Sequence, residues 1–239
     1  MRNASRSLAL VDFVPNVLYL AGSVGIAGSI ARSGGAGLSR MMLAGAVLAF
    51  LAGCLKAASK LRDAIAGRPV SESGFLYDQM FPSMAIGFLA TTSALILFAK
   101  QGASGQAQAA WAPGLSYAVH GAALILLMGI LGSAVAANAP GAVSRPAYRR
   151  LARIAMIVMI VLQLGGLGIL SSLAFRSGSA VAGAFFLLSI LSMLAMGALG
   201  SPSMKDRFTD QITMNWVDQG VNCLGQAFYA AAAVIVLLG

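Results

Sequence analysis

The sequence predicts an all-α integral membrane protein, a single domain of seven transmembrane helices with a cytoplasmic N-terminus and an external C-terminus. Composition is the first observation: of 239 residues, 59% are hydrophobic and only 10% are charged, whereas a soluble domain has about 25% charged residues. The mean hydropathy of +0.84 agrees. The other observations are apolar runs of about 20 residues, the length that spans a bilayer, and Lys and Arg gathered in alternate loops.

The apolar runs predict helices rather than strands. Membrane strands have about 10 residues of alternating polarity, and these runs are longer and apolar on every side. The expected helices cover residues 11–31, 41–58, 80–99, 113–137, 151–174, 179–200 and 214–238. Arg2 and Arg6 precede the first run as in a signal peptide, but Asp12 and Pro15 interrupt it and no clear cleavage site follows, which favours retention over cleavage. No loop between the helices is long enough for a separate domain.

Positive charge predicts the orientation, because Lys and Arg resist translocation. Seven helices place twelve Lys and Arg residues on the side of the N-terminus and four on the other side. We therefore expect the N-terminal side to face the cytoplasm. The twelve are Arg2, Arg6, Lys56, Lys60, Arg62, Arg68, Arg145, Arg149, Arg150, Arg153, Lys205 and Arg207, and the four are Arg32, Arg40, Lys100 and Arg176.

Small residues predict how the helices pack. Lipid tails are as apolar as Leu, so close backbone approach through small residues drives helix association in a bilayer. The expected contact glycines are Gly22, Gly25, Gly28, Gly45, Gly53, Gly165, Gly166, Gly168, Gly220 and Gly225. Cys54 and Cys223 each lie in an apolar run, far apart in sequence, and are expected to act as small buried residues.

Polar residues within the apolar segments form the candidate site. Asp218, Asn222 and Gln226 are spaced four apart, which places them on one face of the last helix. Asp12 and Asn16 have the same spacing in the first helix, and we expect Asp78 to lie just before the third helix on that side of the membrane. Ionisable groups in a membrane are costly. They predict either a polar path between these helices or structural bonds, with the acids paired to Lys56, Lys60 or Arg62.

Two further polar residues are weaker candidates. Gln163 is expected near the middle of the membrane, facing the bundle, and His120 is expected about two turns into the fourth helix. A lone His gives no bis-histidine haem site, and we predict no cofactor and no metal. The sequence contains neither HExxH nor GxSxG, so we predict no catalytic residues. No Lys lies in the last helix, which excludes a retinal Schiff base.

These features predict a non-enzymatic, multi-pass subunit of a transport, translocation or secretion assembly in the bacterial inner membrane. The alternative is a stand-alone carrier or channel for a small solute or ion that uses the polar faces of the first and last helices, and the third is a membrane enzyme acting on lipid. The expected partners are the bilayer, anionic lipid at the cytoplasmic face, and either other proteins or further copies of the chain. The net charge of +9 forms no basic stripe with interleaved aromatics, so nucleic acid is not expected.

One stretch resembles a known class of proteins. "LAGCLKAASKLRD" followed by "PSMAIGFLA" is similar to small membrane subunits of conjugation and type IVB secretion machines. The likeness covers a minority of the chain, includes no specific motif and implies no role for any residue.

Overall fold

The computed structural model describes residues 6–67, 74–104, 129–139, 145–199 and 211–239. These ranges are helical and contain no strand, which confirms the all-α prediction. The helices are α1 (Arg6–Val11), α2 (Val14–Arg32), α3 (Ala36–Ile65), α4 (Phe75–Asp78), α5 (Met80–Ser104), α7 (Arg145–Arg176), α8 (Ala180–Leu199) and α10 (Gln211–Leu238).

Six helical spans in the described ranges are long and apolar enough to cross a membrane. They are Arg6–Arg32, Ala36–Ile65, Phe75–Gln101, Pro146–Arg176, Ala180–Leu199 and Thr213–Leu238. They indicate a multi-pass protein in a lipid bilayer. Of the predicted helix over 113–137, residues 129–137 are helical and residues 113–128 lie outside the described ranges. The count of seven and the orientation therefore stay predictions.

Helix boundaries differ from the predicted ones mainly at polar ends. The second predicted helix, 41–58, extends to Ala36–Ile65, and the fifth, 151–174, extends to Arg145–Arg176. Hydropathy marks only the apolar part of a helix, so turns that carry Lys and Arg were missed. The first predicted helix, 11–31, is divided into α1 and α2 by a turn at Asp12 and Phe13.

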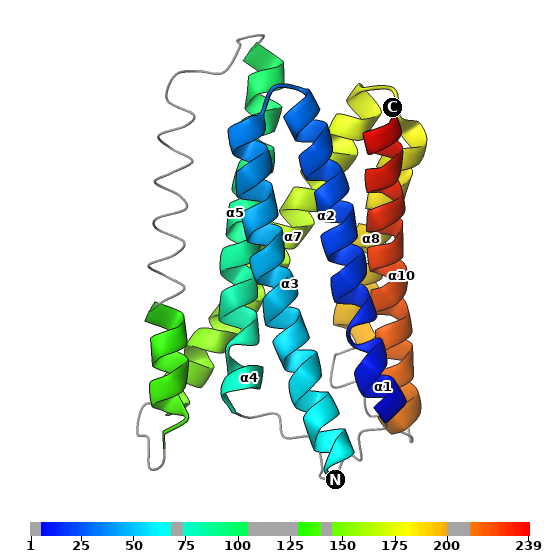
Figure 1. Cartoon of the computed structure of the whole chain (residues 1–239). Helices are drawn as coiled ribbons and strands as arrows, with labels where there is room; N and C mark the ends of the chain where they lie inside the picture. Colours follow the sequence, from blue (N-terminus) through cyan, green and yellow to red (C-terminus); the bar gives the residue numbers. More distant parts are fainter. Residues whose placement is uncertain (1–5, 68–73, 105–128, 140–144, 200–210) are drawn as a thin grey trace.

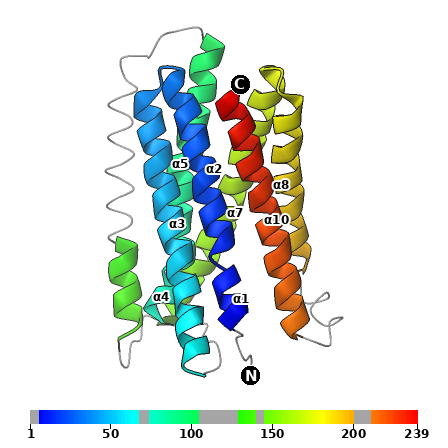
Figure 2. The same ribbon diagram turned by 45° about the vertical axis from the view of Figure 1, so that its right-hand side comes forward.

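The spanning helices form a closed ring. Each packs against two neighbours, in the order α2, α3, α5, α7, α8, α10 and back to α2. Figure 1 shows α2, α5, α7 and α10 running one way and α3 and α8 the other, and the view turned by 45° in Figure 2 preserves this arrangement. Residues brought together at one end of the ring therefore come from the N-terminal parts of four helices and the C-terminal parts of two.

Close backbone approach closes the ring between α2 and α10. A Cβ atom added at Gly22 would lie 2.6 Å from the Tyr229 ring, and one at Gly25 would lie 3.4 Å from Ala233. Gly28 faces Leu237 in the same way. These three glycines form one face of α2, which we call the glycine face. The Arg32 guanidinium, near the far end of α2, donates a hydrogen bond to the Leu237 carbonyl.

The predicted glycine contacts are partly confirmed. Gly45, Gly53 and Gly225 also lie against neighbouring helices, and Gly166 approaches Thr92 of α5. The prediction is wrong among the described residues for Gly165, Gly168 and Gly220, where an added Cβ would meet no atom of those residues within 4 Å. Spacing along a helix does not show which of its faces meets a neighbour, and these three lie away from the contacts.

Alanine substitution at two glycines of α3 tests this packing. A Cβ atom at Gly45 would lie 2.5 Å from the Gly87 carbonyl oxygen of α5, whereas one at Gly37 would meet nothing within 4 Å. Both changes raise helix propensity equally. We expect Gly45→Ala to lower the stability by about 1–3 kcal/mol, because backbone must move, and Gly37→Ala to leave it unchanged or higher. Thermal unfolding in detergent measures both; an equal response of the two variants would contradict the close contact.

Candidate functional site

A cavity of about 630 Å³ lies inside the ring. Its lining residues fall within 12–19 of the α1–α2 segment, 53–57 of α3, 80–88 of α5, 156–164 of α7, 193–197 of α8 and 219–226 of α10. These are N-terminal parts of the helices that run one way and C-terminal parts of the two that run the other way. The cavity therefore occupies the half of the bundle that contains α1, at the bottom of Figure 1. The predicted orientation assigns this half to the cytoplasmic side.

Pro15 creates the polar corner of this cavity. Proline has no N–H to donate, and its ring clashes with the carbonyl of the residue four positions before it. That residue is Val11, where α1 ends. The turn that follows places Asp12 in the cavity wall, and the Asn16 amide donates a 2.9 Å hydrogen bond to the Asp12 carbonyl. The absent side chain of Gly53 leaves room for that amide, which an added Cβ would overlap.

Asp12 forms an ion pair across the α1–α3 contact. Its Oδ2 lies 2.5 Å from Lys60 Nζ, and its side chain is only 6% exposed, against 24% for Lys60. This is one of the pairings that the structural alternative predicted. The second oxygen, Oδ1, is buried and accepts no hydrogen bond from the described residues. One carboxylate oxygen is thus neutralised, and the other is buried without a hydrogen-bond partner among the described residues.

The predicted polar face of α10 reaches the cavity in part. Asn222 and Gln226 line it, together with Gln219, whereas Asp218 is absent from the lining. The lining positions 219, 222 and 226 follow the spacing of three and four that defines one face of a helix. It differs from the predicted face at one position: the first lining residue is Gln219 and not Asp218. Asp12, Asn16, Asn222 and Gln226 are therefore brought together; their roles in function stay predictions.

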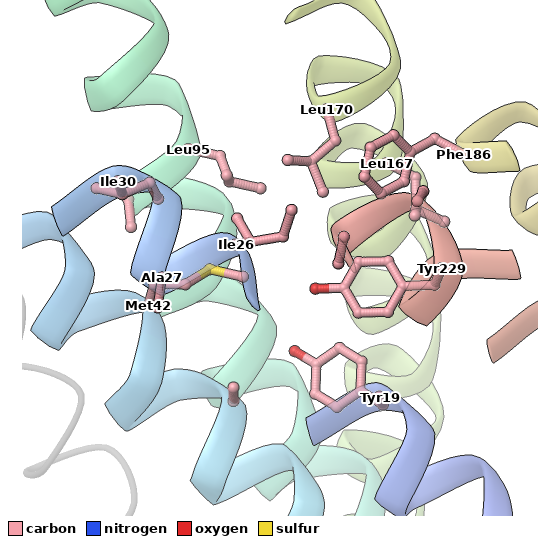
Figure 3. Close-up of a cluster of buried hydrophobic side chains, with 14 of the residues drawn as sticks. Tyr19, Ile26, Ala27, Ile30, Met42, Leu95, Leu167, Leu170, Phe186 and Tyr229 are labelled. Carbon is pink, nitrogen blue, oxygen red and sulfur yellow. The ribbon is translucent and has the colours of Figure 1, made fainter. Parts of the chain in front are cut away.

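An aromatic layer ends the cavity near mid-bundle. The Tyr19 ring lies 5.2 Å from Phe88 and 5.7 Å from Tyr229, and Phe186 lies 6.0 Å from Tyr229, measured between ring centroids. Tyr229 and Ser23 share a buried hydrogen bond of 2.9 Å. Figure 3 shows the two tyrosine rings side by side, with apolar side chains packed beyond them. We call Tyr19, Phe88, Phe186 and Tyr229 the aromatic layer.

A second cavity of about 30 Å³ lies behind the aromatic layer. It shares Tyr19, Phe88, Gln163 and Gln226 with the large cavity. A space of this size can hold one or two water molecules. Gln163 and Gln226 line both cavities and therefore lie between them.

Asp78 lies outside the cavity. It accepts hydrogen bonds at Oδ2 from the Asn138 amide, at 3.2 Å, and from the Gly74 N–H, at 3.3 Å. The Tyr148 hydroxyl donates to its backbone carbonyl at 3.2 Å. Asp78 thus joins α4, residues 129–139 and α7, which makes its visible role structural. The other remaining candidate, His120, lies outside the described residues.

Sequence reasoning missed the apolar wall of the cavity. Six methionines line it: Met80, Met84, Met156, Met159, Met193 and Met196. Each of α5, α7 and α8 contributes one pair, spaced three or four apart. This spacing, repeated in three helices, was the available signal. It was overlooked because methionine in an apolar helix carries no polarity that marks a site.

Comparisons with known proteins assign no family. No protein-family model, no curated protein and no solved structure matches this chain. The function must therefore be argued from the cavity itself.

The ion pair predicts a compensating pair of substitutions. Lys60→Met leaves the Asp12 carboxylate buried without its cation, and breaking a buried pair in this way costs about 3–5 kcal/mol. We expect a matching loss of thermal stability. Adding Asp12→Asn removes the buried charge and should restore most of the lost thermal stability. The exposed Lys100 gives the control Lys100→Met, with no expected effect; a double variant no more stable than Lys60→Met would contradict the pairing.

The hydrogen bond of the aromatic layer predicts a double-mutant cycle. Tyr229→Phe leaves the fully buried Ser23 hydroxyl without a partner, at a cost of about 1–3 kcal/mol. Removing both polar groups, with Tyr229→Phe and Ser23→Ala together, should cost less than the sum of the single changes. Thermal unfolding of the four proteins measures the coupling, and strictly additive costs would show that the bond contributes nothing.

Proposed function

We propose that this protein is a membrane carrier that binds a small solute in the central cavity. One observation carries the proposal: the polar faces of the first and last helices of the ring line the same cavity of about 630 Å³. Known small-molecule sites have volumes of about 300–1,000 Å³ and combine an apolar lining with a few polar groups. This cavity has both properties.

The aromatic layer supports a carrier more than an open channel. An open channel needs a continuous path, whereas the lining of the large cavity reaches only as far as Tyr19 and Phe88 on one side and Gln226 on the other. Beyond them lies the packed core around Ile26, Met42 and Leu170. A solute in the cavity would meet water from one side alone. A carrier would have to separate the aromatic layer to release it on the other side.

Catalysis has less support than binding. Asp12 is the one carboxylate among the described lining residues, and it is already paired with Lys60. Acid–base chemistry on a lipid needs a group free to exchange a proton with the reacting atoms. The amides of Asn16, Asn222 and Gln226 can hold a solute but cannot do that work.

The predicted role as a subunit of an assembly requires an outer surface that binds a protein partner. Apolar side chains such as Ile157, Val161 and Leu191 are exposed on α7 and α8, and they suit lipid and a protein partner equally. Purification in mild detergent separates the two roles. A partner held at fixed stoichiometry supports a subunit, and a single chain or a homo-oligomer supports a carrier.

Cysteine accessibility tests the one-sided cavity. With Cys54 and Cys223 replaced by Ala, we introduce Asn222→Cys in the cavity and, as a control, Leu224→Cys on the exposed apolar side of the same helix. We expect a membrane-impermeant thiol reagent to modify position 222 only from the side of the membrane that holds the N-terminus. Position 224 should stay unmodified from both sides, because ionised thiolates and charged reagents avoid lipid.

Sided vesicles give the readout, since inside-out and right-side-out preparations expose opposite faces. Equally fast reaction at position 222 from both sides would indicate a pore, because a carrier exposes the cavity to the second side only while the aromatic layer is separated. Reaction from neither side would mean that the cavity is sealed, and the carrier proposal would fail.

A further inference from the structure

The cavity has two chemically different walls. The walls supplied by the α1–α2 segment, α3 and α10 carry nearly all of its polar groups, including Asp12, Asn16, Gln219, Asn222 and Gln226. The walls supplied by α5, α7 and α8 are apolar apart from Gln163, with the six methionines already named. A ligand that fills this space meets hydrogen-bonding groups along one side and thioethers along the other.

Two acceptor atoms on the polar wall have no donor. Asp12 Oδ1 and Gln219 Oε1 are both shielded from solvent and accept no hydrogen bond from the described residues. Buried polar atoms in native proteins nearly always have a partner. Both atoms belong to residues that line the cavity, so a rotation of either side chain would let its acceptor meet a hydroxyl group of a ligand.

The charges of the lining favour a ligand without net charge. Asp12 and Lys56 carry the two formal charges among the described lining residues, and these have opposite signs. Asp12 is in addition paired with Lys60, 2.5 Å away, so a cationic ligand would meet a carboxylate that is already neutralised. Lys56 also has an interaction of its own within the protein, so an anionic ligand would have to replace it to offset its loss of hydration.

The methionine wall favours a flexible apolar body. Methionine has three rotatable side-chain bonds and a polarisable sulfur, and it adapts to ligands of varied shape. Thioethers also bind soft cations such as Cu(I). A coordinated ion, however, occupies far less space than about 630 Å³ and leaves the acceptors on the polar wall unused.

We propose that the cavity binds an uncharged amphiphile, with a hydroxylated head against Asp12 and Gln219 and a flexible hydrocarbon chain along the methionines of α5, α7 and α8. This inference rests on the proposed function and names its class of ligand. In such a ligand the hydroxylated head matches the polar wall of the cavity, and the hydrocarbon chain matches the methionine wall.

Photolabelling in phosphatidylcholine nanodiscs tests the proposal; sugar detergents are avoided because they are themselves hydroxylated amphiphiles. The probe is a monoacylglycerol with a diazirine in its acyl chain. Helix α7 offers an internal comparison, since Met156 and Met159 line the cavity while Ile157 and Val161 are exposed on the outer side. We expect saturable labelling at positions 156 and 159, displaced by unlabelled monoacylglycerol, and only non-saturable labelling at 157 and 161.

Matched ligands test the role of the head. The same probe with both hydroxyls methylated keeps the shape and loses the donors, and we expect its apparent affinity to fall about tenfold or more. Acyl probes with a trimethylammonium or a carboxylate head should bind more weakly as well. Equal labelling by the methylated or charged probes would overturn the proposal, and so would displacement of the probe by one equivalent of silver(I), which would point to a metal site.

Variants on one helix test the contact with the head. Gln219→Leu removes an acceptor at similar volume, and we expect about tenfold weaker labelling. Val217→Leu, at an exposed position two residues away, should change nothing. If labelling behaves as described but position 222 reacts equally fast from both sides of the membrane, the ligand class stands and the carrier fails. If the reaction is one-sided but the methylated probe labels as well as the parent probe, the ligand class alone is overturned.

Discussion

The constraint on which this structure depends is that polar side chains of a membrane helix cannot face hydrocarbon. The α1–α2 segment and α10 carry carboxylate and amide groups, which have to face inward. Six spanning helices arranged as a ring provide one interior for all of them. Asn222, Gln219 and Gln226 line the cavity that this interior encloses. The Asp12–Lys60 pair, at 2.5 Å, settles one charge, and the remaining polar atoms stay oriented toward the space.

Packing of the bundle divides it into two halves with different properties. On one side of the aromatic layer, Ile26, Ile30 and Met42 are almost fully buried in a tight core. On the other side, the helices enclose the cavity. Close helix crossings at glycine need no bulky side chains, so the α2–α10 contact is rigid where the core is dense. The half that holds the cavity encloses about 630 Å³ of space in place of a packed core.

The sequence predicted the class of fold well and the site in part. Apolar length identified the membrane spans, and the four-residue spacing of Asn222 with Gln226 placed both amides on the side of α10 that lines the cavity. Asp218 does not line the cavity, because helical spacing gives a face but not its neighbour, whereas Asp78 lies just before α5, as expected, but outside the cavity. Pro15 marked the interruption of the first helix, yet only the three-dimensional arrangement brings Asp12 beside Lys60. The methionine wall required knowledge of which three helices share an interior, and no local pattern supplies that.

The α2–α10 contact also bears on how the protein is made. The two helices that close the ring are separated by nearly 180 residues of intervening chain, so α2 enters the membrane long before its partner is translated. Until then the glycine face can only be covered by lipid or by the insertion machinery. The ring would consequently close only when α10 is inserted and Tyr229 packs beside Gly22.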